Sequence, residues 1–525
     1  MNVRFLGEPL PYEDGAEDEL TRIFRAAADR TTGSAELESH IHDWPSRYHL
    51  SGRRANLLRA LDVRPGDRVL DVGAGTGLLS RYLVEQGATV VALEGNGARA
   101  HAAAARLDGL DRCEVVCGDF YEFADDDGFD LVTLVGVVEY SGDAFGGAHG
   151  PLRLLAKATS LLRPGGSVLV AIENQLGITY VLGGPEDHHG VPSVGIEGYR
   201  NPRPIRTWSR SNLSSLLDQA GLTTQDWWYP YPDYKLPTAV LSHEVVARTE
   251  PGVVTRLVGD PTPVQADHVA PSSHPVRSLE TFAAAGLGPE VANSFLVLAS
   301  PDAGARRWFA ADTVGWFEPQ GINAGPSGWH RLAPDLRTEA YDPLVTATTL
   351  FDAVRDAVDT EDGARLRELL GTWAAWVDAQ TQADGTVAGD AAGLTADRLV
   401  LGDDDQLVPD AIAVGAPPVA RATYVAHVLR NLALDLEAAG TLVGDGTTDL
   451  VALLTEHAGT AARTDWPDDL DELEDRWASV TGRSAAPLTT AVVPVAPTEP
   501  GPVPDAPPAP VPPAPRRGFW SRRRS

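Results

Sequence analysis

Lysine, cysteine and methionine are scarce in this chain of 525 residues. Lysine occurs only at Lys157 and Lys235 among 43 basic residues, which most simply reflects a genome bias toward arginine and makes each retained lysine notable. The two cysteines, Cys113 and Cys117, fall in one expected strand, and no cluster of His or Cys completes the four ligands that a structural zinc site needs. We therefore expect no metal ion at the cysteines and none elsewhere in the chain.

Long apolar runs and excess positive charge are absent as well. No segment approaches the length that spans a bilayer, and residues 1–19 are acidic, without the basic flank and apolar stretch of a signal peptide. These absences favour a cytoplasmic protein. The formal net charge is −30, whereas binding a phosphate backbone needs a basic face. We expect a small-molecule partner and no nucleic acid.

The chain is too long for one core, because single cores stop growing near about 250 to 300 residues. Short apolar strands alternate with amphipathic helices after residue 61, which is typical of a parallel sheet covered on both faces. We predict these units: a helical lead-in at 1–60, an α/β domain at 61–250 with an insertion at 175–207, a connecting segment at 251–290, an α-rich α+β domain at 291–485 and a disordered Pro-rich tail at 486–525.

The tail ends in clustered arginines beside Phe519 and Trp520. Such a sequence would allow weak contact with an anionic membrane surface or an acidic partner. The alternative, which we favour, is a solvated tail without a partner.

Three glycines alternate in Arg68-Val-Leu-Asp-Val-Gly-Ala-Gly-Thr-Gly77, at an expected strand-to-helix turn. Without Cβ atoms such a turn lets a ligand lie against the backbone, and the helix N-terminus that follows offers free N–H groups. Alone, the loop is shared by dinucleotide-binding proteins and by plain turns. The dinucleotide fingerprint places its third glycine three residues after the second, whereas Gly73, Gly75 and Gly77 are evenly spaced.

Acidic residues accompany this loop and end the next expected strands. Asp71 precedes the glycines, and Asp119 ends the third strand. Glu94 closes the second strand about twenty residues after the loop, where it can accept hydrogen bonds from both hydroxyls of a ribose. These positions narrow the choice of cofactor.

At this point residues 47–246 resemble the class I S-adenosylmethionine methyltransferases, through the glycine loop, Glu94, Gly118-Asp119-Phe120, the segment 129–140 and Leu162-Arg-Pro-Gly-Gly166. The resemblance implies a Rossmann-like α/β fold with a mostly parallel seven-stranded sheet, helices on both faces and S-adenosylmethionine as cofactor. It places Asp71 near the methionine amine, the glycines against the cofactor backbone, Glu94 on the ribose, Asp119 at adenine N6 and Phe120 beside the adenine, with Val135 completing the site.

Arg54 extends the resemblance upstream of the glycine loop. It ends Tyr48-His-Leu-Ser-Gly-Arg-Arg54, which is similar to the segment that some family members use to hold the cofactor carboxylate. An arginine on the surface of a helix is the alternative reading of this position.

Candidates for catalysis follow the fourth and fifth strands. Methyl transfer from a sulfonium is an in-line displacement, so most of the acceleration comes from holding nucleophile and methyl group in line. A base is needed only for a hydroxyl or another protonated acceptor. Ligands in such folds bind at the carboxyl ends of the strands, where Glu139 and Tyr140 follow one strand and Glu173 and Asn174 follow the next. We predict Glu139 as a catalytic residue.

The insertion and the segment 227–237 add imidazole, acidic and aromatic groups in loops, a placement that favours function over packing. We predict His188 as a catalytic residue, and Lys235 as a point charge for a substrate carboxylate or phosphate. A metal site at His188 and His189 is a less favoured alternative. The aromatic residues either stack on a sugar or only cap the sheet.

The segments Glu186-Asp-His188, Gly195-Ile-Glu-Gly-Tyr199 and Tyr231-Pro-Asp-Tyr-Lys-Leu-Pro237 are similar to those of bacterial methyltransferases associated with cell-surface glycan assembly. The resemblance implies transfer to a small-molecule or glycan acceptor, and we expect O-methylation. A scaffold that binds the cofactor without catalysis is the main alternative. An oxidoreductase on a dinucleotide fold is disfavoured by the evenly spaced glycines and by Asp119.

The second region carries one faint resemblance of its own. Residues 393–410 resemble the catalytic loop of small-molecule phosphotransferases, but Arg398 stands at the asparagine position and no glycine-rich phosphate loop lies upstream. We expect either a degenerate kinase-like lobe or, with more support, a plain helical accessory domain.

Overall fold

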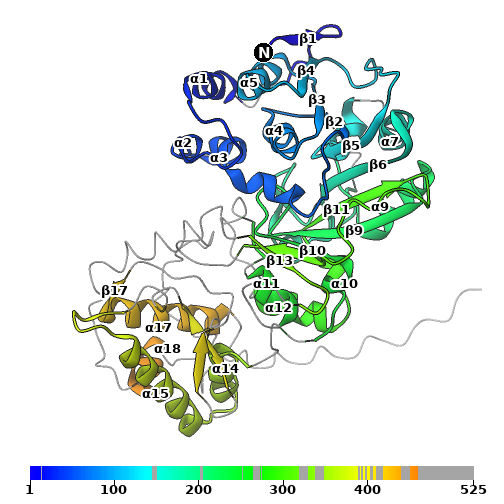
Figure 1. The fold of residues 1–525 in the computed structure, drawn as a ribbon. Helices are drawn as coiled ribbons and strands as arrows, with labels where there is room; N and C mark the ends of the chain where they lie inside the picture. The colour runs from blue at the N-terminus through cyan, green and yellow to red at the C-terminus, as the bar shows by residue number, and fades with distance from the viewer. Residues whose placement is uncertain are drawn as a thin grey trace, which may run out of the picture.

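The main sheet of the protein has eleven strands and runs through the upper two thirds of the molecule (Figure 1). The coordinates are a computed structural model. They describe residues 1–458 except 13–14, 145–149, 201–204, 251, 260, 264–271, 274, 319–328, 337–347, 388–390, 392–393, 397–398, 403–405, 410–417 and 439–449.

The sheet changes direction in its middle. From β1 to β6 neighbouring strands are parallel, and from β11 to β13 each strand is antiparallel to the one before. In spatial order the strands are β1 (Val3–Phe5), β4 (Cys113–Cys117), β3 (Thr89–Glu94), β2 (Arg68–Val72), β5 (Phe129–Val135), β6 (Leu162–Glu173), β11 (Ser294–Ser300), β9 (Thr224–Tyr231), β10 (Ala239–Ser242), β12 (Gly315–Phe317) and β13 (His330–Leu332).

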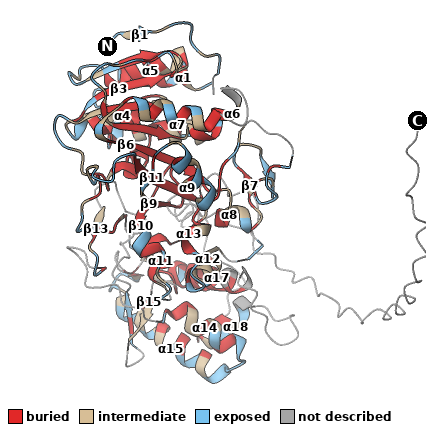
Figure 2. Cartoon of the chain, turned by 90° about the vertical axis from the view of Figure 1, so that its right-hand side faces the viewer, coloured by how far each residue is buried: buried red, intermediate tan, exposed pale blue. Residues whose placement is uncertain are grey.

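Helices cover both faces of the parallel half. Successive residues of a strand point to opposite faces, and Val69 of β2 accordingly packs with Leu83 of α4, whereas Leu70 belongs to the core beside α7 and α9. Figure 2 shows buried positions along the strands of the sheet and on the sides of the helices that face it. The helices here are α4 (Leu78–Glu85), α5 (Gly97–Leu107), α7 (Gly150–Ser160) and α9 (Arg210–Gln219).

Shorter helices complete this part of the chain. They are α1 (Glu17–Ala26), α2 (Ala35–Glu38), α3 (Trp44–Leu50), the 3₁₀ helices η1 (Gly52–Leu58) and η2 (Val138–Tyr140), α6 (Ser141–Ala144), α8 (Ile178–Val181), α10 (His243–Val246), α11 (Val253–Val258), α12 (Pro275–Ala284) and α13 (Gly288–Val291). The small strands β7 (Pro185–Glu186) and β8 (Val191–Pro192) form a hairpin inside the insertion.

The order of the strands fixes the place where a ligand binds. The chain passes from β2 to β3 and β4 on one side, and then returns to add β5 and β6 on the other side of β2. In open α/β sheets the crevice outside the carboxyl ends of the strands, at such a reversal, is the ligand site. The loops after β2, β3, β5 and β6 therefore surround it.

The α/β class with a Rossmann-like centre is confirmed, but the expected seven strands and the domain boundary at residue 250 are wrong. β11 was assigned to the second domain, yet it lies in the main sheet between β6 and β9. Residues 1–60 are also more than a helical lead-in, because β1 pairs with β4.

A second, mainly helical unit has its own apolar core. It contacts the main sheet's part of the chain through Arg277, whose Nη1 lies 2.5 Å from an Asp352 carboxylate oxygen and whose guanidinium stacks 4.3 Å from the Phe351 ring. Its elements are α14 (Leu350–Asp359), α15 (Gly363–Gln380), α17 (Arg421–Ala438) and α18 (Leu450–His457), with the two-stranded pairs β14 (Thr386–Val387) with β17 (Val419–Ala420) and β15 (Leu399–Leu401) with β16 (Leu407–Pro409).

Two expectations concern residues outside the described part. Arg398 and the aspartates 403–405 and 410 of the kinase-like segment lie outside it, as does the whole tail from 486 to 525 with its arginine-rich end. Both stay predictions. Across the residues that are described, no helix has the combination of length and apolar character required to cross a bilayer.

The position of β11 yields a prediction about truncation. A chain cut after residue 250 would lack β11, the strand that pairs with both β6 and β9. It would also lack Phe295, so the core residues that pack against this ring would be exposed. We expect such a chain to show no cooperative thermal unfolding by far-ultraviolet circular dichroism, whereas a chain cut after residue 336 unfolds cooperatively. Cooperative unfolding of the shorter chain would contradict the observed strand order.

Candidate active site

The glycine loop connects β2 to α4 and has a left-handed backbone at all three glycines, with φ of 71°, 56° and 79° at Gly73, Gly75 and Gly77. A Cβ at Gly73 would lie 2.7 Å from Val137 Cγ2, and one at Gly77 would lie 3.2 Å from Ala103, so these two glycines are required for packing. At Gly75 nothing lies within 4 Å of the Cβ position. The loop therefore opens to free space at Gly75.

Asp71 is buried beneath this loop and is fully engaged. One carboxylate oxygen accepts a 2.6 Å hydrogen bond from the Ser80 hydroxyl, and the other accepts one of 2.7 Å from Thr133. Burial raises its pKa, although both hydroxyls and the charge of Arg54 oppose that shift. In the structure Asp71 ties β2 to α4 and β5 rather than presenting free oxygens to a ligand.

Arg54 lies in η1, close enough to this site for its charge to act on Asp71. Its guanidinium stacks 3.9 Å above the Tyr48 ring, and its Nη1 is buried without a hydrogen-bond partner among the described residues. It is 9 % exposed, so the surface-helix reading is wrong. A buried guanidinium with a free donor fits a carboxylate such as that of the cofactor's methionine.

Glu94 at the end of β3 is almost fully buried and already has partners. Its Oε2 accepts a 2.8 Å hydrogen bond from Gly75 N, and its Oε1 accepts one of 2.9 Å from Asn96 N. Oε1 also accepts a hydrogen bond from the Tyr12 hydroxyl, which the sequence analysis did not single out. Burial, the charge of Glu94 and this hydrogen bond raise the pKa of Tyr12, so the phenol stays protonated and donates.

Residues 3–12 reach this place because the chain crosses the carboxyl ends of β3 and β4 after β1. Leu6 N donates to Cys117 O at 2.9 Å, and Leu10 N donates to Gly95 O at 2.8 Å. Gly95 and Gly118 make room, because Cβ atoms there would lie 2.8 Å from Leu10 and Leu6 respectively. The N-terminal segment thus covers the expected ribose site.

The other expected cofactor residues are less accessible. Asp119 is half-buried and accepts a 2.9 Å hydrogen bond from Tyr121 N. Phe120 and Val135 belong to the buried cores on opposite faces of the sheet. A place beside the adenine for Phe120 stays a prediction, and the structure itself gives the ring a packing role.

On the acceptor side, the three predicted catalytic residues come together from distant parts of the chain. Glu139 lies in η2 after β5, His188 in the insertion, and Lys235 in the loop between β9 and β10. His188 Nε2 is 4.0 Å from Glu139 Oε1. Lys235 is linked to this pair through Glu173, at the end of β6, to which its ammonium donates.

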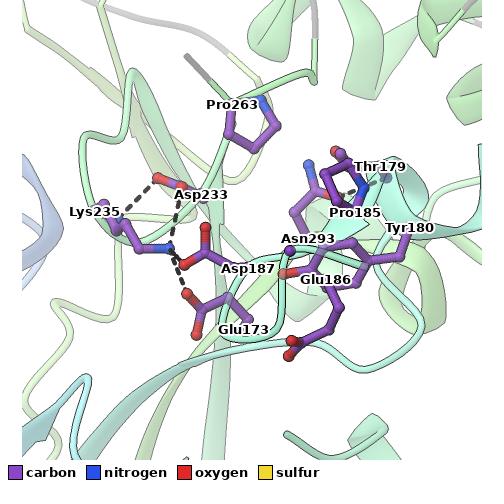
Figure 3. A pocket seen from close by; sticks show the side chains of 11 residues that line it. Glu173, Thr179, Tyr180, Pro185, Glu186, Asp187, Asp233, Lys235, Pro263 and Asn293 are labelled. Carbon is purple, nitrogen blue, oxygen red and sulfur yellow. Dashed lines mark hydrogen bonds and ion pairs between the residues drawn. The ribbon is translucent and has the colours of Figure 1, made fainter. Parts of the chain in front are cut away.

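Lys235 has more acidic partners than a free anion-binding lysine would have. Besides Glu173, its Nζ lies 3.0 Å from Asp187 Oδ2 and 3.8 Å from Asp233 Oδ2 (Figure 3). Burial alone would lower the pKa of Lys235, but these carboxylates raise it well above its usual range, so the lysine stays charged. The expectation that Lys235 holds an anionic substrate group is therefore not supported.

A cavity of about 200 Å³ adjoins Lys235, and four of its eleven lining residues are acidic. Figure 3 shows the carboxylates of Glu173, Asp187 and Asp233 converging on the ammonium at one side of it. The lining residues are Glu173, Thr179, Tyr180, Pro185, Glu186, Asp187, Gly190, Asp233, Lys235, Pro263 and Asn293.

Glu186 organises the insertion, and sequence reasoning gave it no role of its own. Its carboxylate accepts hydrogen bonds from the backbone N–H groups of His188 and His189, both at 3.0 Å, and from the Tyr199 hydroxyl at 3.2 Å. It also lies 3.1 Å from His188 Nδ1. The motifs Glu186-Asp-His188 and Gly195–Tyr199 are therefore one unit.

The protonation of the buried pair follows from its surroundings. Burial, and next the charge of Glu173, raise the pKa of Glu139 well above its usual range. Burial lowers the pKa of His188, but the Glu186 hydrogen bond and the charges of Glu173 and Glu139 outweigh it and raise that pKa to about 9. Near neutral pH the pair therefore holds at least one proton.

Two alternatives left open by the sequence are decided by the geometry. His189 does not join His188, because its Nε2 donates to Ile205 O at 3.0 Å. The aromatic residues 227–231 lie on β9, where Trp227, Trp228, Tyr229 and Tyr231 are buried in the sheet's cores. They cap the sheet rather than line an acceptor site.

Comparisons with known proteins match the same part of the chain. Residues 70–170 match the family described as a methyltransferase domain. The chain is 29 % identical over 233 residues to the ubiquinone biosynthesis O-methyltransferase of Xanthomonas campestris pv. campestris strain B100, covering 42 % of this chain and 90 % of that protein. It is 35 % identical over 122 residues to the demethylmenaquinone methyltransferase of Clavibacter sepedonicus, covering 22 % and 45 % of the two chains.

Among solved structures, similarity extends to an S-adenosylmethionine-dependent methyltransferase of Geobacter sulfurreducens in complex with S-adenosyl-L-homocysteine. The identity is 19 %, the match covers 54 % of this chain and 96 % of that one, and the TM-score is 0.26.

The strand order, the glycine loop and the matched domain define an S-adenosylmethionine-dependent methyltransferase. Its cofactor is S-adenosylmethionine, and the residues present fit that group, because Gly75 opens to free space and Arg54 offers a buried donor that has no partner among the described residues.

Gly75→Ala tests the cofactor loop. An L-residue in a left-handed conformation costs roughly 1–2 kcal/mol, and the new methyl group would occupy the free space at the loop. We expect binding of S-adenosylhomocysteine, measured by calorimetry, to weaken at least about tenfold. Gly165→Ala is the matched control, because Gly165 has φ 79° and free space around it but lies near the start of β6, away from the carboxyl ends of the strands. Equal binding by the two variants would remove Gly75 from the site.

Tyr12→Phe tests whether the N-terminal segment competes with the cofactor. If the ribose replaces the Tyr12 hydroxyl as the donor to Glu94, the cofactor first has to break a hydrogen bond to a charged group, which is worth about 1.5–3 kcal/mol. In the variant this bond is already absent. We expect adenosine to bind about tenfold more tightly to the variant in calorimetry. 2′,3′-Dideoxyadenosine should show no gain, and weaker adenosine binding would contradict the competition.

Proposed function

We propose that this methyltransferase acts on a hydroxyl oxygen of a small acceptor held beside Glu139, Glu173 and His188. The observation that carries the proposal is the pair Glu139 and His188, whose nearest polar atoms lie 4.0 Å apart while both side chains are buried. A hydroxyl is the acceptor that needs such groups, because its proton has to leave during the reaction. The printed name of the Xanthomonas relative, an O-methyltransferase, supports the choice of oxygen.

The residues of the chain would divide the work in a simple way. The bound cofactor supplies a methyl group on a sulfonium, whose carbon–sulfur bond breaks as the new carbon–oxygen bond forms. Glu139 and His188 would bind the acceptor hydroxyl, and the unprotonated member of the pair would take up its proton and pass it to solvent as the oxygen attacks the methyl carbon. Lys235 keeps the carboxylates of Glu173 and Asp187 in place. Alignment of the acceptor with the methyl group provides most of the remaining acceleration.

The charge of the site narrows the acceptor. Five carboxylates, those of Glu139, Glu173, Glu186, Asp187 and Asp233, outnumber the basic groups that lie beside them in the described part of the chain, which are Lys235, His188 and His189. Such surroundings repel phosphate and carboxylate groups and suit neutral molecules with several hydroxyls, each of which can donate to a carboxylate. We therefore propose a sugar-like acceptor, with glycan precursors as the first candidates, in a cytoplasmic enzyme without a nucleic-acid partner.

For the cofactor we propose a site built from the glycine loop, Arg54, Glu94 and Asp119. Arg54 would hold the methionine carboxylate, Glu94 the ribose and Asp119 the adenine amino group, with Asp71 positioning the loop from below. The free donor of Arg54 and the free space at Gly75 support this arrangement.

A labelled-methyl transfer screen tests the function. The full chain is incubated with S-adenosylmethionine and a panel of neutral sugars, nucleotide sugars and small phenols, and methylated products are identified by mass spectrometry. We expect transfer to a neutral hydroxyl acceptor, with Glu139→Gln and His188→Ala lowering kcat about 10²- to 10⁴-fold and leaving the affinity for S-adenosylhomocysteine unchanged.

His189→Gln serves as the matched control, because its amide can still donate to Ile205 O and it lies outside the pair. Unchanged turnover in Glu139→Gln and His188→Ala would remove both residues from the mechanism. Tight cofactor binding without transfer to any acceptor would instead favour a scaffold.

A further inference from the structure

Glu139, Glu173 and His188 bring three potential ligand atoms to one point. A carboxylate oxygen of each glutamate and a ring nitrogen of His188 all lie within 4.8 Å of one another. They come from η2, from the end of β6 and from the insertion, so three independent elements converge here. All three side chains are at most 4 % exposed.

Three buried carboxylate oxygens at this point lack hydrogen-bond partners among the described residues. Both Glu139 oxygens and Glu173 Oε2 are buried without a hydrogen-bond partner among the described residues. Lys235 contacts the other Glu173 oxygen and does not satisfy these three. A buried carboxylate without partners is costly, and two together repel each other. A cation bound at this point would take one oxygen of each glutamate as a ligand and would compensate the charge of both carboxylates.

His188 is oriented as a metal ligand. Its Nδ1 is held by Glu186 at 3.1 Å, which turns Nε2 toward Glu139. Glu186 is itself fixed by the Tyr199 hydroxyl and by two backbone N–H groups of the insertion. Ligating histidines usually donate their second ring N–H to a carboxylate in this way, which fixes both the tautomer and the ring.

We propose that Glu139, Glu173 and His188 bind a divalent cation of the Mn²⁺ or Mg²⁺ type. Ligands of an octahedral ion at about 2.1 Å lie about 3 to 4.2 Å apart, so the cluster would close by a fraction of an ångström. Two carboxylates and one imidazole suit such an ion and leave coordination positions open. The proposal departs from the expectation of a chain without metal, and it uses one histidine with two glutamates rather than the pair His188 and His189.

The role of the cation rests on the proposed function. An acceptor hydroxyl in an open coordination position would lose its proton more easily, as metal-bound oxygen does. The proton passes to solvent, the oxygen forms the bond to the methyl carbon, and the electron pair of the carbon–sulfur bond stays on sulfur. The products are the methyl ether, S-adenosylhomocysteine and one proton.

Mn²⁺ alone is the probe, because its binding can be followed without an acceptor. The full chain, freed of metal with a chelator, is titrated with Mn²⁺ by calorimetry and electron paramagnetic resonance. We expect one site, with Kd rising on the order of 100-fold in Glu139→Gln and in His188→Gln. Asp127→Asn, which removes an exposed carboxylate far from the cluster, should leave Kd unchanged. Retained S-adenosylhomocysteine binding and melting temperature show that each variant is folded.

Each outcome counts for or against the cation. Absence of Mn²⁺ binding at millimolar concentration, or binding that both variants keep, would refute it. Methyl transfer that persists in excess chelator would refute it as well, while leaving the proposed function intact. A third outcome separates the two proposals. If both variants lose Mn²⁺ binding but the unaltered chain methylates no hydroxyl, the cation site is supported and the proposed acceptor is rejected.

Discussion

The repulsion between two buried carboxylates, those of Glu139 and Glu173, is the constraint that the rest of the acidic site has to meet. β5 and β6 are parallel neighbours, so Glu139 after one and Glu173 at the end of the other meet at the same edge of the sheet. Their repulsion has to be offset locally, because water cannot screen groups this deep. Lys235 and His188 supply that offset, and other carboxylates hold both cations in place: Asp187 and Asp233 for Lys235, and Glu186 for His188. The insertion is thus ordered by these charged contacts as well as by the apolar packing of Ile178 and Leu182.

The sequence predicted what depends on neighbours along the chain. The alternation of β2 and α4, the left-handed glycines and the acid at the end of β3 all follow from local pattern, and each is present. The convergence of Glu139, His188 and Lys235 was also predictable, since the carboxyl ends of parallel strands share one edge. The strand β11 was misassigned because a sequence shows that a segment is a strand but not which strand it pairs with. Tyr12 was missed because its partner, Glu94, lies in another segment. Glu186 was missed because the residue pattern of the insertion does not show that its carboxylate accepts from His188, His189 and Tyr199.

The cofactor side has an unusual feature for a site that must admit a large ligand. Glu94 is satisfied by Gly75, Asn96 and Tyr12, so its carboxylate is held in place before any ribose arrives. Preorganisation of this kind lowers the entropy lost on binding. The Tyr12 hydroxyl works in the opposite direction if it has to be displaced. The affinity for the cofactor then depends on two opposing effects, the preorganised Glu94 carboxylate and the competing Tyr12 hydroxyl. The strength of the competition depends on how firmly the backbone hydrogen bonds of Leu6 and Leu10 hold the N-terminal segment.

The charge of the acceptor site also bears on the rate. A sulfonium is cationic before methyl transfer and neutral afterwards, so its charge is already partly dispersed in the transition state. An excess of carboxylates nearby stabilises the ground state more than the transition state, which opposes catalysis. The site therefore gains by compensating Glu139 and Glu173 locally, with a proton shared with His188 or with a divalent cation. For the proposed hydroxyl acceptor, a cation has the further advantage that it compensates the carboxylates and at the same time binds the acceptor oxygen. A proton on Glu139, by contrast, removes the group that could accept one from the acceptor. The acidic cluster and the chemistry of a sulfonium are thus compatible only when the cluster carries a positive partner.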